Sequence, residues 1–317
     1  MTEKIIIVGG GSAGWMSAAT LIKAFPHKDI TVIESPNTPT VGVGESTIGS
    51  INDWLSFLEL EDKDWMPHVG ASYKLSIKFT DFYKKGEEFH YPFGLPYEPY
   101  ISNDTRNKMA KSFDGFDYHK DAAYHFDALL FAKYLKENYC LPRGVKHIKE
   151  HINTVETNEH GIISLNDKHT ADLYLDCTGF KSLLMKEVNS KFIHMNHILP
   201  NDSAWSTKLE YTDKEKQLEP YTNCTAIENG WVWNIPQWQK IGTGYVYSSK
   251  YIDDDQALED FHNYLGKPKN VNYKKTGMRV GRHKHMWKKN VCSIGLAAGF
   301  IEPLESTGLL QTHVFLL

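Results

Sequence analysis

Residues 4–34, KIIIVGGGSAGWMSAATLIKAFPHKDITVIE, decide the fold of this 317-residue chain. The stretch opens with the β-branched apolar run 5–8, which has the composition of a strand buried on both faces. A glycine-rich turn follows, and then an alanine-rich segment, 15–24, with helical character. A second run of the buried-strand type, 30–33, ends on Glu34. The order of these segments predicts a strand–helix–strand unit of the dinucleotide-binding type.

Three glycines and one acid in this unit indicate its ligand. Gly9 makes the tight turn, Gly11 lets the backbone approach a pyrophosphate, and Gly14 lets helix and strand pack closely. The start of the helix adds free N–H groups and a positive dipole for the phosphates. Glu34 is placed to accept hydrogen bonds from a ribose 2′-OH, which favours FAD or NAD over NADP.

Composition and charge exclude several classes of protein. The formal net charge is −4, so the composition lacks the excess of basic residues that nucleic-acid binding requires. The first strand begins within four residues of the start, so no signal peptide fits, and no uncharged apolar run approaches the roughly 18–20 residues of a membrane span. We therefore expect a soluble cytoplasmic protein with no membrane or nucleic-acid partner. The cysteines are scattered without a CxxC pair, which predicts a reducing compartment and no metal site; they are Cys140, Cys177, Cys224 and Cys292.

Three segments before residue 100 allow two interpretations each. In 41–47 two glycines flank Val43, so the backbone could lie against a ligand or simply turn; on this scaffold we favour a ligand contact. In 71–82 alternation predicts a strand with Lys74 and Lys78 on one face. On spacing alone, these lysines indicate a solvated strand face rather than a catalytic one. The aromatic, proline-rich loop 88–99 forms either a pocket wall or local packing.

The other elements follow from periodicity and capping residues. We expect helices at 48–60, at 121–138 with Asp121 as its cap, and at 254–265, and a loop over 103–120. Strands are expected at 146–154 and 162–165, in one small sheet, and at 203–209, 224–227, 230–236 and 243–249.

Two further buried strands, 173–180 and 291–300, end in small residues, as strands facing the ligand crevice of an open α/β sheet commonly do. After the second strand, 301–308 should open a helix whose free amides make an anion site for a phosphate or a halide.

These motifs together resemble the flavin-dependent halogenases of the tryptophan halogenase family. GWxWxIP and FxxPxxSxG are the specific signatures, because other flavin monooxygenases share the glycine motif but not these. The matching segments run in family order: GGGSAGW (9–15), GVGEST (42–47), ASYKLSIKF (71–79), YHFDA (124–128), DCTGF (176–180), GWVWNIP (230–236), GTGYVYSS (242–249) and FIEPLESTG (300–308).

The resemblance implies an α/β fold: a Rossmann-type, glutathione-reductase-like FAD-binding domain with an interleaved β-rich substrate region. It assigns nucleotide binding to 1–50, 121–190 and 285–317, and the substrate-side sheet and loops to 51–120 and 191–284.

The resemblance also assigns roles to particular residues. Lys74, and not Lys78, matches the catalytic lysine; Glu305 matches the active-site glutamate, with Ser306 beside it. The halide site falls on Thr307 and Gly308, and the substrate pocket on Tyr91, Phe93, Trp231 and Trp233. Cofactor contacts fall on Gly9, Gly10, Gly11, Ser12, Ala13, Gly14, Glu34, Ser35, Val43, Ser46, Leu296 and Leu309.

The implied chemistry uses reduced FAD from a separate flavin reductase, O₂, and chloride or bromide. Hypohalous acid would travel through an interior tunnel to Lys74, which becomes a haloamine or hydrogen-bonds the acid. Glu305 would orient the oxidant or take the proton of the arenium intermediate. Burial lowers a lysine's pKa, so its neutral amine is reachable. The Trp231/Trp233 face would keep organic substrate away from the flavin and so prevent monooxygenation.

Two departures from the family pattern leave alternatives open. Tryptophan-specific members carry a histidine two residues before a phenylalanine, where this chain has Tyr91 before Phe93 and its nearest histidine is His90. An electron-rich aromatic other than tryptophan is therefore also possible as substrate. The family continues with a C-terminal helical region that is absent here, so we expect a fragment whose apolar residues 309–317 need a partner. A flavin hydroxylase and an inactive flavin-binding remnant are the alternative functions.

Overall fold

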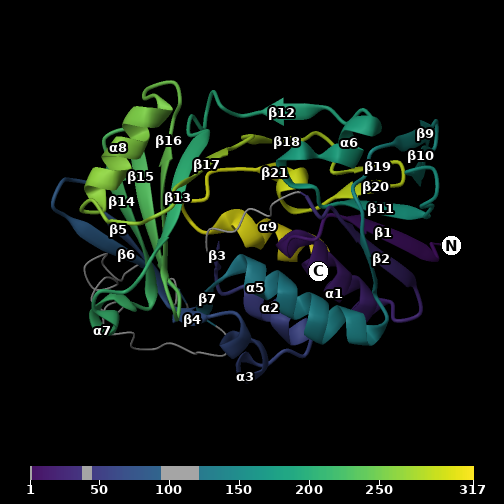
Figure 1. The fold of residues 1–317 in the computed structure, drawn as a ribbon, viewed down its shortest axis with the longest axis horizontal. Helices are drawn as coiled ribbons and strands as arrows, with labels where there is room; N and C mark the ends of the chain where they lie inside the picture. Colours follow the sequence, from purple (N-terminus) through teal and green to yellow (C-terminus); the bar gives the residue numbers. More distant parts are fainter. Residues whose placement is uncertain (1, 38–44, 94–120) are drawn as a thin grey trace, which may run out of the picture.

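A six-stranded, largely parallel sheet carries the predicted nucleotide-binding unit (Figure 1). The computed structural model describes residues 2–37, 45–93 and 121–317. In spatial order the strands are β19 (Trp287–Lys288), β20 (Val291–Ser293), β11 (Leu173–Asp176), β1 (Lys4–Val8), β2 (Asp29–Glu34) and β8 (Lys146–Lys149). All neighbours pair in parallel except β19 with β20. From β8 to β20 the chain order is 3-2-1-4-5, which confirms the Rossmann-type sheet.

Eight α-helices in the described residues accompany this sheet and a second sheet described below. None of the helices in the described parts of the chain is long and apolar enough to cross a bilayer. The α-helices are α1 (Ser12–Ala24), α2 (Ile51–Phe57), α3 (Asp62–Trp65), α5 (Ala128–Tyr134), α6 (Leu183–Glu187), α7 (Lys214–Gln217), α8 (Asp254–Tyr264) and α9 (Thr307–Leu316). Shorter turns are η1 (Met66–His68), the π-helical η2 (Leu135–Cys140), η3 (Leu141–Arg143), η4 (Gly179–Lys181) and η5 (Gly295–Ala297).

A second sheet of seven strands stands apart from the first, with α8 against it (Figure 1). Its strands are β17 (Lys274–Gly277), β13 (Ser203–Leu209), β16 (Ile241–Tyr247), β15 (Gly230–Pro236), β14 (Tyr221–Ile227), β5 (Ser76–Thr80) and β6 (Glu88–Pro92). The predicted strands 203–209 and 230–236 match β13 and β15. The two sheets follow the predicted division between nucleotide-binding and substrate-side segments, although the division into domains stays a prediction.

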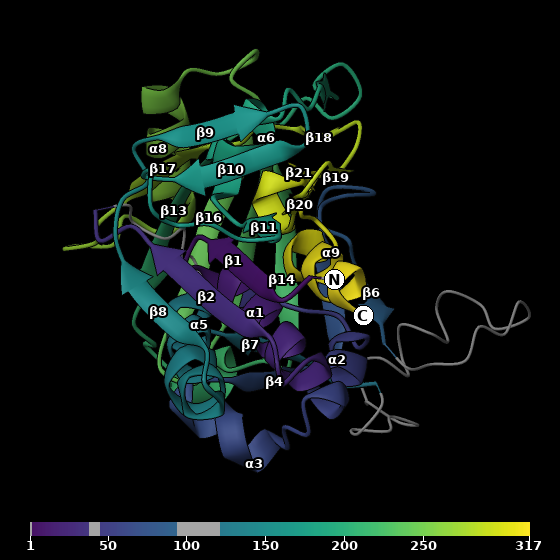
Figure 2. The ribbon, with the colours of Figure 1, turned by 90° about the vertical axis from the view of Figure 1, so that its right-hand side faces the viewer.

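Three small sheets complete the described fold. They are β3 (Glu45–Ser46) with β7 (Ala123–Phe126) and β4 (Ser72–Lys74); β9 (Val155–Asn158) with β10 (Gly161–Leu165); and β12 (Phe192–His194) with β18 (Gly281–His283) and β21 (Gly299–Phe300). Figure 2 shows the β9–β10 pair lying apart from the edge strand β8. The predicted pairing of 146–154 with 162–165 is therefore wrong: β8 adds to the parallel sheet beside β2, and 155–158 pairs with β10.

The predicted helix 121–138 begins too early. Its first residues form β7, which is buried along its whole length between β3 and β4. The helix cap is Asp127, whose carboxylate accepts hydrogen bonds from the amides of Leu129 (2.9 Å) and Leu130 (3.1 Å). The apparent helical spacing misled because Leu129 and Leu130 are exposed, so they are not part of an apolar stripe.

Two other expectations need correction around residues 71–99. The segment 88–92 is not a loop, because it pairs with β5 as the edge strand β6. The segment 71–82 is not one strand, because the chain leaves the small sheet after Lys74 and enters the seven-stranded sheet at Ser76. Between them, the Leu75 amide donates to the Pro220 carbonyl (2.8 Å) and the Leu75 carbonyl accepts from the Phe93 amide (3.0 Å). Lys74 and Lys78 therefore belong to different sheets. Residues 38–44 and 94–120, including Val43 and the predicted loop 103–120, lie outside the described residues.

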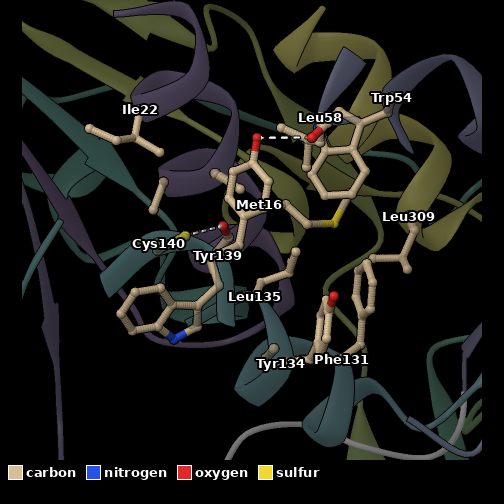
Figure 3. Close-up of a cluster of buried hydrophobic side chains, with 14 of the residues drawn as sticks. Met16, Ile22, Trp54, Leu58, Phe131, Tyr134, Leu135, Tyr139, Cys140 and Leu309 are labelled. Atoms are coloured by element: carbon tan, nitrogen blue, oxygen red, sulfur yellow. Dashed lines mark hydrogen bonds between the residues drawn. The ribbon is translucent and has the colours of Figure 1, made fainter. Parts of the chain in front are cut away.

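The largest apolar core joins α1 to α2, α5 and η2 (Figure 3). Trp15, Trp54 and Phe131 are almost completely buried in it. The Tyr139 hydroxyl donates to the Leu58 carbonyl (3.1 Å), so even the polar atom of this ring is satisfied. Leu309 of α9 enters the same core (Figure 3), which anchors the start of α9 next to the glycine-rich turn.

Candidate functional site

The glycine-rich turn lies at the carboxyl end of β1, where strand order reverses between β2 and β11. Gly9 has φ 119°, and a Cβ on it would run into the Cys177 carbonyl. A Cβ on Gly14 would likewise run into the Gly9 carbonyl. Helix α1 begins one residue after its cap Gly11, with no side chain capping its amides and no acid in its first turn. The turn is therefore a narrow backbone cradle with free amides, as phosphate binding requires.

Glu34 lies against this turn at the end of β2. A Cβ on Gly10 would collide with the Glu34 side chain, which places the carboxylate over the turn. Its Oε2 lies 2.8 Å from Nε2 of His147 on β8, and the His147 ring packs edge-on against Trp15 (5.4 Å). Sequence reasoning missed His147, because only the pairing of β8 with β2 brings it to Glu34.

A cavity of about 490 Å³ extends from the glycine-rich turn to the inner face of the seven-stranded sheet. Of the predicted site residues, the cavity is lined by Gly9, Gly10, Gly11, Ser12, Ala13, Glu34, Ser35, Ser46, Trp231, Trp233, Leu296, Ser306, Gly308 and Leu309. One continuous space thus joins the nucleotide motif to the GWVWNIP strand and to the start of α9. Gly14, Lys74, Tyr91, Phe93, Glu305 and Thr307 are not among the lining residues.

Lys74 lies just beyond the end of this cavity and is fully buried. Its Nζ donates to the Thr47 carbonyl (2.7 Å) and to the Ser306 hydroxyl (2.8 Å), and it lies 4.9 Å from the centre of the Phe93 ring. Because burial penalises the charged form, the pKa of Lys74 falls to about 7. The interpretation of a solvated strand face is therefore wrong for Lys74.

Lys78 has a different environment. Its ammonium pairs with Glu88 on β6 at 2.8 Å and lies 5.6 Å from the centre of the Tyr221 ring. The side chain remains 19% exposed, so the solvated interpretation holds better for this lysine. The pair therefore offers a matched comparison between a buried lysine and a partly exposed one.

The residues of the FIEPLESTG segment differ in burial and in their position relative to the cavity. Ser306 is buried, with φ 62°, and precedes the first residue of α9 without capping the helix by its side chain. Thr307 begins α9 and donates its hydroxyl to the Glu302 carbonyl (3.2 Å). Glu305 is exposed, so the structure does not bring it into the cavity beside Ser306.

Two carboxylic acids were missed by sequence reasoning. Glu45 lines the cavity, and burial together with the charge of Asp127 raises its pKa to about 7. One of its oxygens would lie 3.8 Å from a Cβ on Gly308, so the acid faces the start of α9. Glu302 accepts from Trp231 Nε1 (2.8 Å), and burial raises its pKa. The position of Glu45 within GVGEST was the available signal.

The four residues predicted for the substrate pocket divide into two groups. Trp231 and Trp233 line the cavity, with ring centres 6.1 Å apart. Phe93 is buried beside Lys74, while Tyr91 is 54% exposed on the edge strand β6. Trp231 and Trp233 thus share the cavity with the glycine-rich turn, whereas Phe93 lies beside Lys74.

A cavity that runs from a Rossmann-type glycine-rich turn to the hydroxyl bonded by a buried lysine defines a nucleotide-binding α/β protein with a lysine amine next to its site. The family model described as "Tryptophan halogenase" matches residues 4–114 and 101–316, and the chain belongs to this family of flavin-dependent halogenases.

Named relatives agree with the family assignment. A tryptophan 6-halogenase of Streptomyces toxytricini is 34% identical over 98% of this chain and 70% of its own length. The tryptophan 7-halogenase of Lentzea aerocolonigenes is 35% identical over 97% of this chain and 67% of its own. Among solved structures, apo VirX1 superposes with a TM-score of 0.92 at 40% identity, covering all of this chain and 69% of its own. These findings do not favour the hydroxylase or remnant alternatives.

Proposed function

We propose that this halogenase uses reduced FAD, O₂ and chloride or bromide to halogenate an electron-rich, indole-like aromatic such as tryptophan. The observation that carries the proposal is the position of Lys74, whose buried amine donates to a hydroxyl on the wall of the nucleotide cavity. The substrate class is supported by the relatives from Streptomyces toxytricini and Lentzea aerocolonigenes, which are named for tryptophan.

The cavity residues fit FAD. The Gly9–Gly14 cradle and the uncapped start of α1 suit its pyrophosphate, and Glu34 suits a ribose hydroxyl. FAD, when bound and reduced, would supply two of the four electrons that O₂ takes up, and the halide would supply the other two as it becomes hypohalous acid. The proposed contacts are Gly9, Gly10, Gly11, Ser12, Ala13, Gly14, Glu34, Ser35, Val43, Ser46, Leu296 and Leu309, of which Val43 lies outside the described residues.

The halide is proposed to bind the amides of Thr307 and Gly308. Support comes from α9, a ten-residue helix that begins at Thr307 with no side-chain cap, while Gly308 lines the cavity. Free amides and the positive end of a helix dipole attract an anion. Glu45 faces the same place, and its protonated form would not repel the halide.

Lys74 is proposed to receive electrophilic halogen on its neutral amine and to deliver it to the aromatic substrate. Its pKa of about 7 makes that neutral form abundant at neutral pH. Trp231 and Trp233 stand on the cavity side and would keep organic substrate from the flavin. Tyr91, Phe93 and Glu305 are proposed on the substrate side, with Glu305 orienting the oxidant or accepting the ring proton.

Two wider inferences accompany this function. We infer that a separate flavin reductase supplies the reduced cofactor, as the flavin-dependent family requires. We also infer a cytoplasmic setting, which is supported by the four free cysteines, three of them buried.

A comparison of Lys74→Met with Lys78→Met tests the function. Each protein receives FAD, a flavin reductase, O₂, halide and a panel of indoles and phenols, and halogenated product is measured by mass spectrometry. We expect Lys74→Met to lose product while flavin oxidation continues, and Lys78→Met to keep most activity. Halogenation by Lys74→Met at the wild-type rate would refute the lysine-directed proposal, and hydroxylated product without halide would favour the monooxygenase.

A further inference from the structure

A chain of buried hydroxyl groups links Lys74 to a histidine on β7. From the Lys74 amine it passes through Ser306 (2.8 Å), Ser46 (3.0 Å) and Thr222 (2.7 Å) to Nε2 of His125 (2.9 Å). All five side chains are buried, and they come from β4, the loop before α9, β3, β14 and β7. Figure 1 shows β3 and β7 just below α9.

We propose that His125 is a positioning residue that fixes the direction of this chain, so that Ser306 always accepts from Lys74 and leaves the amine lone pair free. The proposal rests on the proposed function, because the free lone pair is what takes up electrophilic halogen.

The direction follows from counting donors from the lysine end. An ammonium can only donate, so the Ser306 oxygen accepts and its own proton goes to Ser46. The Ser46 proton then goes to Thr222, and the Thr222 proton to Nε2 of His125. If each hydroxyl gives its one proton to the next member of the chain, Nε2 of His125 accepts the last one and carries none.

The histidine end is consistent with this direction. His125 Nδ1 makes no hydrogen bond to the described residues, and the Pro236 carbonyl acts on the ring to raise its pKa. A carbonyl can only accept, so it favours the tautomer with the proton on Nδ1. Burial, and then the charge of Lys74, hold the His125 pKa well below its usual range, so the ring stays neutral. Both ends therefore favour Nε2 as an acceptor.

The consequence concerns the neutral form of Lys74. A neutral amine has two N–H groups, and the Thr47 carbonyl and Ser306 hydroxyl accept both. If the chain ran the other way, Ser306 would donate to the amine and occupy its lone pair. His125, as the last acceptor, prevents that reversal without touching Lys74.

Other titratable groups near Lys74 leave this balance undisturbed. A charged Cys224 thiolate on β14 would raise the pKa of Lys74. Burial raises the pKa of Cys224 to about 12, so the thiol stays neutral. The charge of Glu302 raises the pKa of Cys224 further, and its carboxylate accepts a hydrogen bond from Trp231. Glu45 is the neighbour of Ser46, and the charge that raises its pKa is that of Asp127.

The first test needs no activity measurement. In flavin-free protein labelled with ¹⁵N-histidine, NMR should show His125 as the neutral Nδ1–H tautomer from pH 6 to pH 9. Its signal is assigned by its absence from His125→Gln. A proton on Nε2, or a charged ring in this range, would overturn the proposal while leaving the role of Lys74 intact.

The second test measures single-turnover halogenation against pH. Thr222→Val breaks the chain, Thr222→Ser restores it, and Thr225→Val is the control on the same strand. We expect Thr222→Val to lose about 10-fold at pH 8–9, where the amine is neutral, and little at pH 6, where it has no lone pair to protect. Thr222→Ser and Thr225→Val should match wild type. Equal rates for Thr222→Val at all pH values, or an equal loss at all of them, would refute the positioning role.

Discussion

Replacing Lys74 by methionine should change how stability depends on pH, independently of any activity. The pKa of Lys74 is about 7 in the folded protein, against an ordinary value of 10.5 expected when the chain unfolds. Between these two values the unfolded state binds more protons, so stability rises with pH. Below pH 7 both states are protonated, and the full cost of burying the charge, on the order of 5 kcal/mol, is present.

The slope between pH 7 and pH 9 can be worked out from those values. One pKa unit corresponds to about 1.4 kcal/mol, and near pH 7 half of the folded molecules are already deprotonated, which reduces the gain. Wild type should therefore gain about 2 kcal/mol over Lys74→Met between pH 7 and pH 9. Methionine has a similar length and no charge, so its curve should lack this rise.

Urea unfolding at pH 7, 8 and 9 makes the measurement, with Lys78→Met as the control. Because Lys78→Met keeps Lys74 in place, its curve should keep the rise seen for wild type. Parallel curves for wild type and Lys74→Met would refute the reasoning, because they would mean that Lys74 is not a buried titrating amine.

Three further predictions concern the turn, the anion site and the core. Gly9→Ala should weaken FAD binding in a flavin-fluorescence titration and cost about 1–2 kcal/mol of stability, because φ is 119° and the Cβ meets a carbonyl, whereas Gly86→Ala, at φ 87° with open space, should leave FAD binding unchanged. Halide affinity should fall on the order of 10-fold as pH rises from 6 to 8, because Glu45 ionises near pH 7; Glu45→Gln, followed by halide-dependent rates, should weaken that dependence and leave the part that comes from Lys74. Leu309→Ala should cost about 2–5 kcal/mol in urea unfolding because Leu309 is buried in the α1 core, whereas exposed Val314→Ala should change little.

Local patterns predicted the parts of the fold that local forces determine. The strand–turn–helix–strand unit at 4–34 has its glycines and acid at fixed offsets, and the predicted ranges 203–209 and 230–236 coincide with β13 and β15. The predictions failed where a distant partner decides the structure. Residues 123–126 form a strand because β3 and β4 pair with them, and a 3.6-residue period cannot report that pairing.

The same distinction explains the candidate site. The resemblance singled out Lys74 and Ser306, but the alternation of 71–82 placed Lys74 in solvent because it could not reveal the change of sheet at Leu75. His125 and Thr222 drew no attention, since the bond between Ser46 and Thr222 spans 176 positions of the chain. Residues that act through such contacts have no local spacing to detect.

The geometry at Lys74 also explains how a buried lysine can be tolerated at neutral pH. An ammonium has three N–H groups, but only the Thr47 carbonyl and the Ser306 hydroxyl are found as acceptors among the described residues. Two acceptors match a neutral amine, so the loss of one proton leaves both hydrogen bonds intact. Desolvation, which lowers the pKa, and the number of acceptors therefore favour the same protonation state.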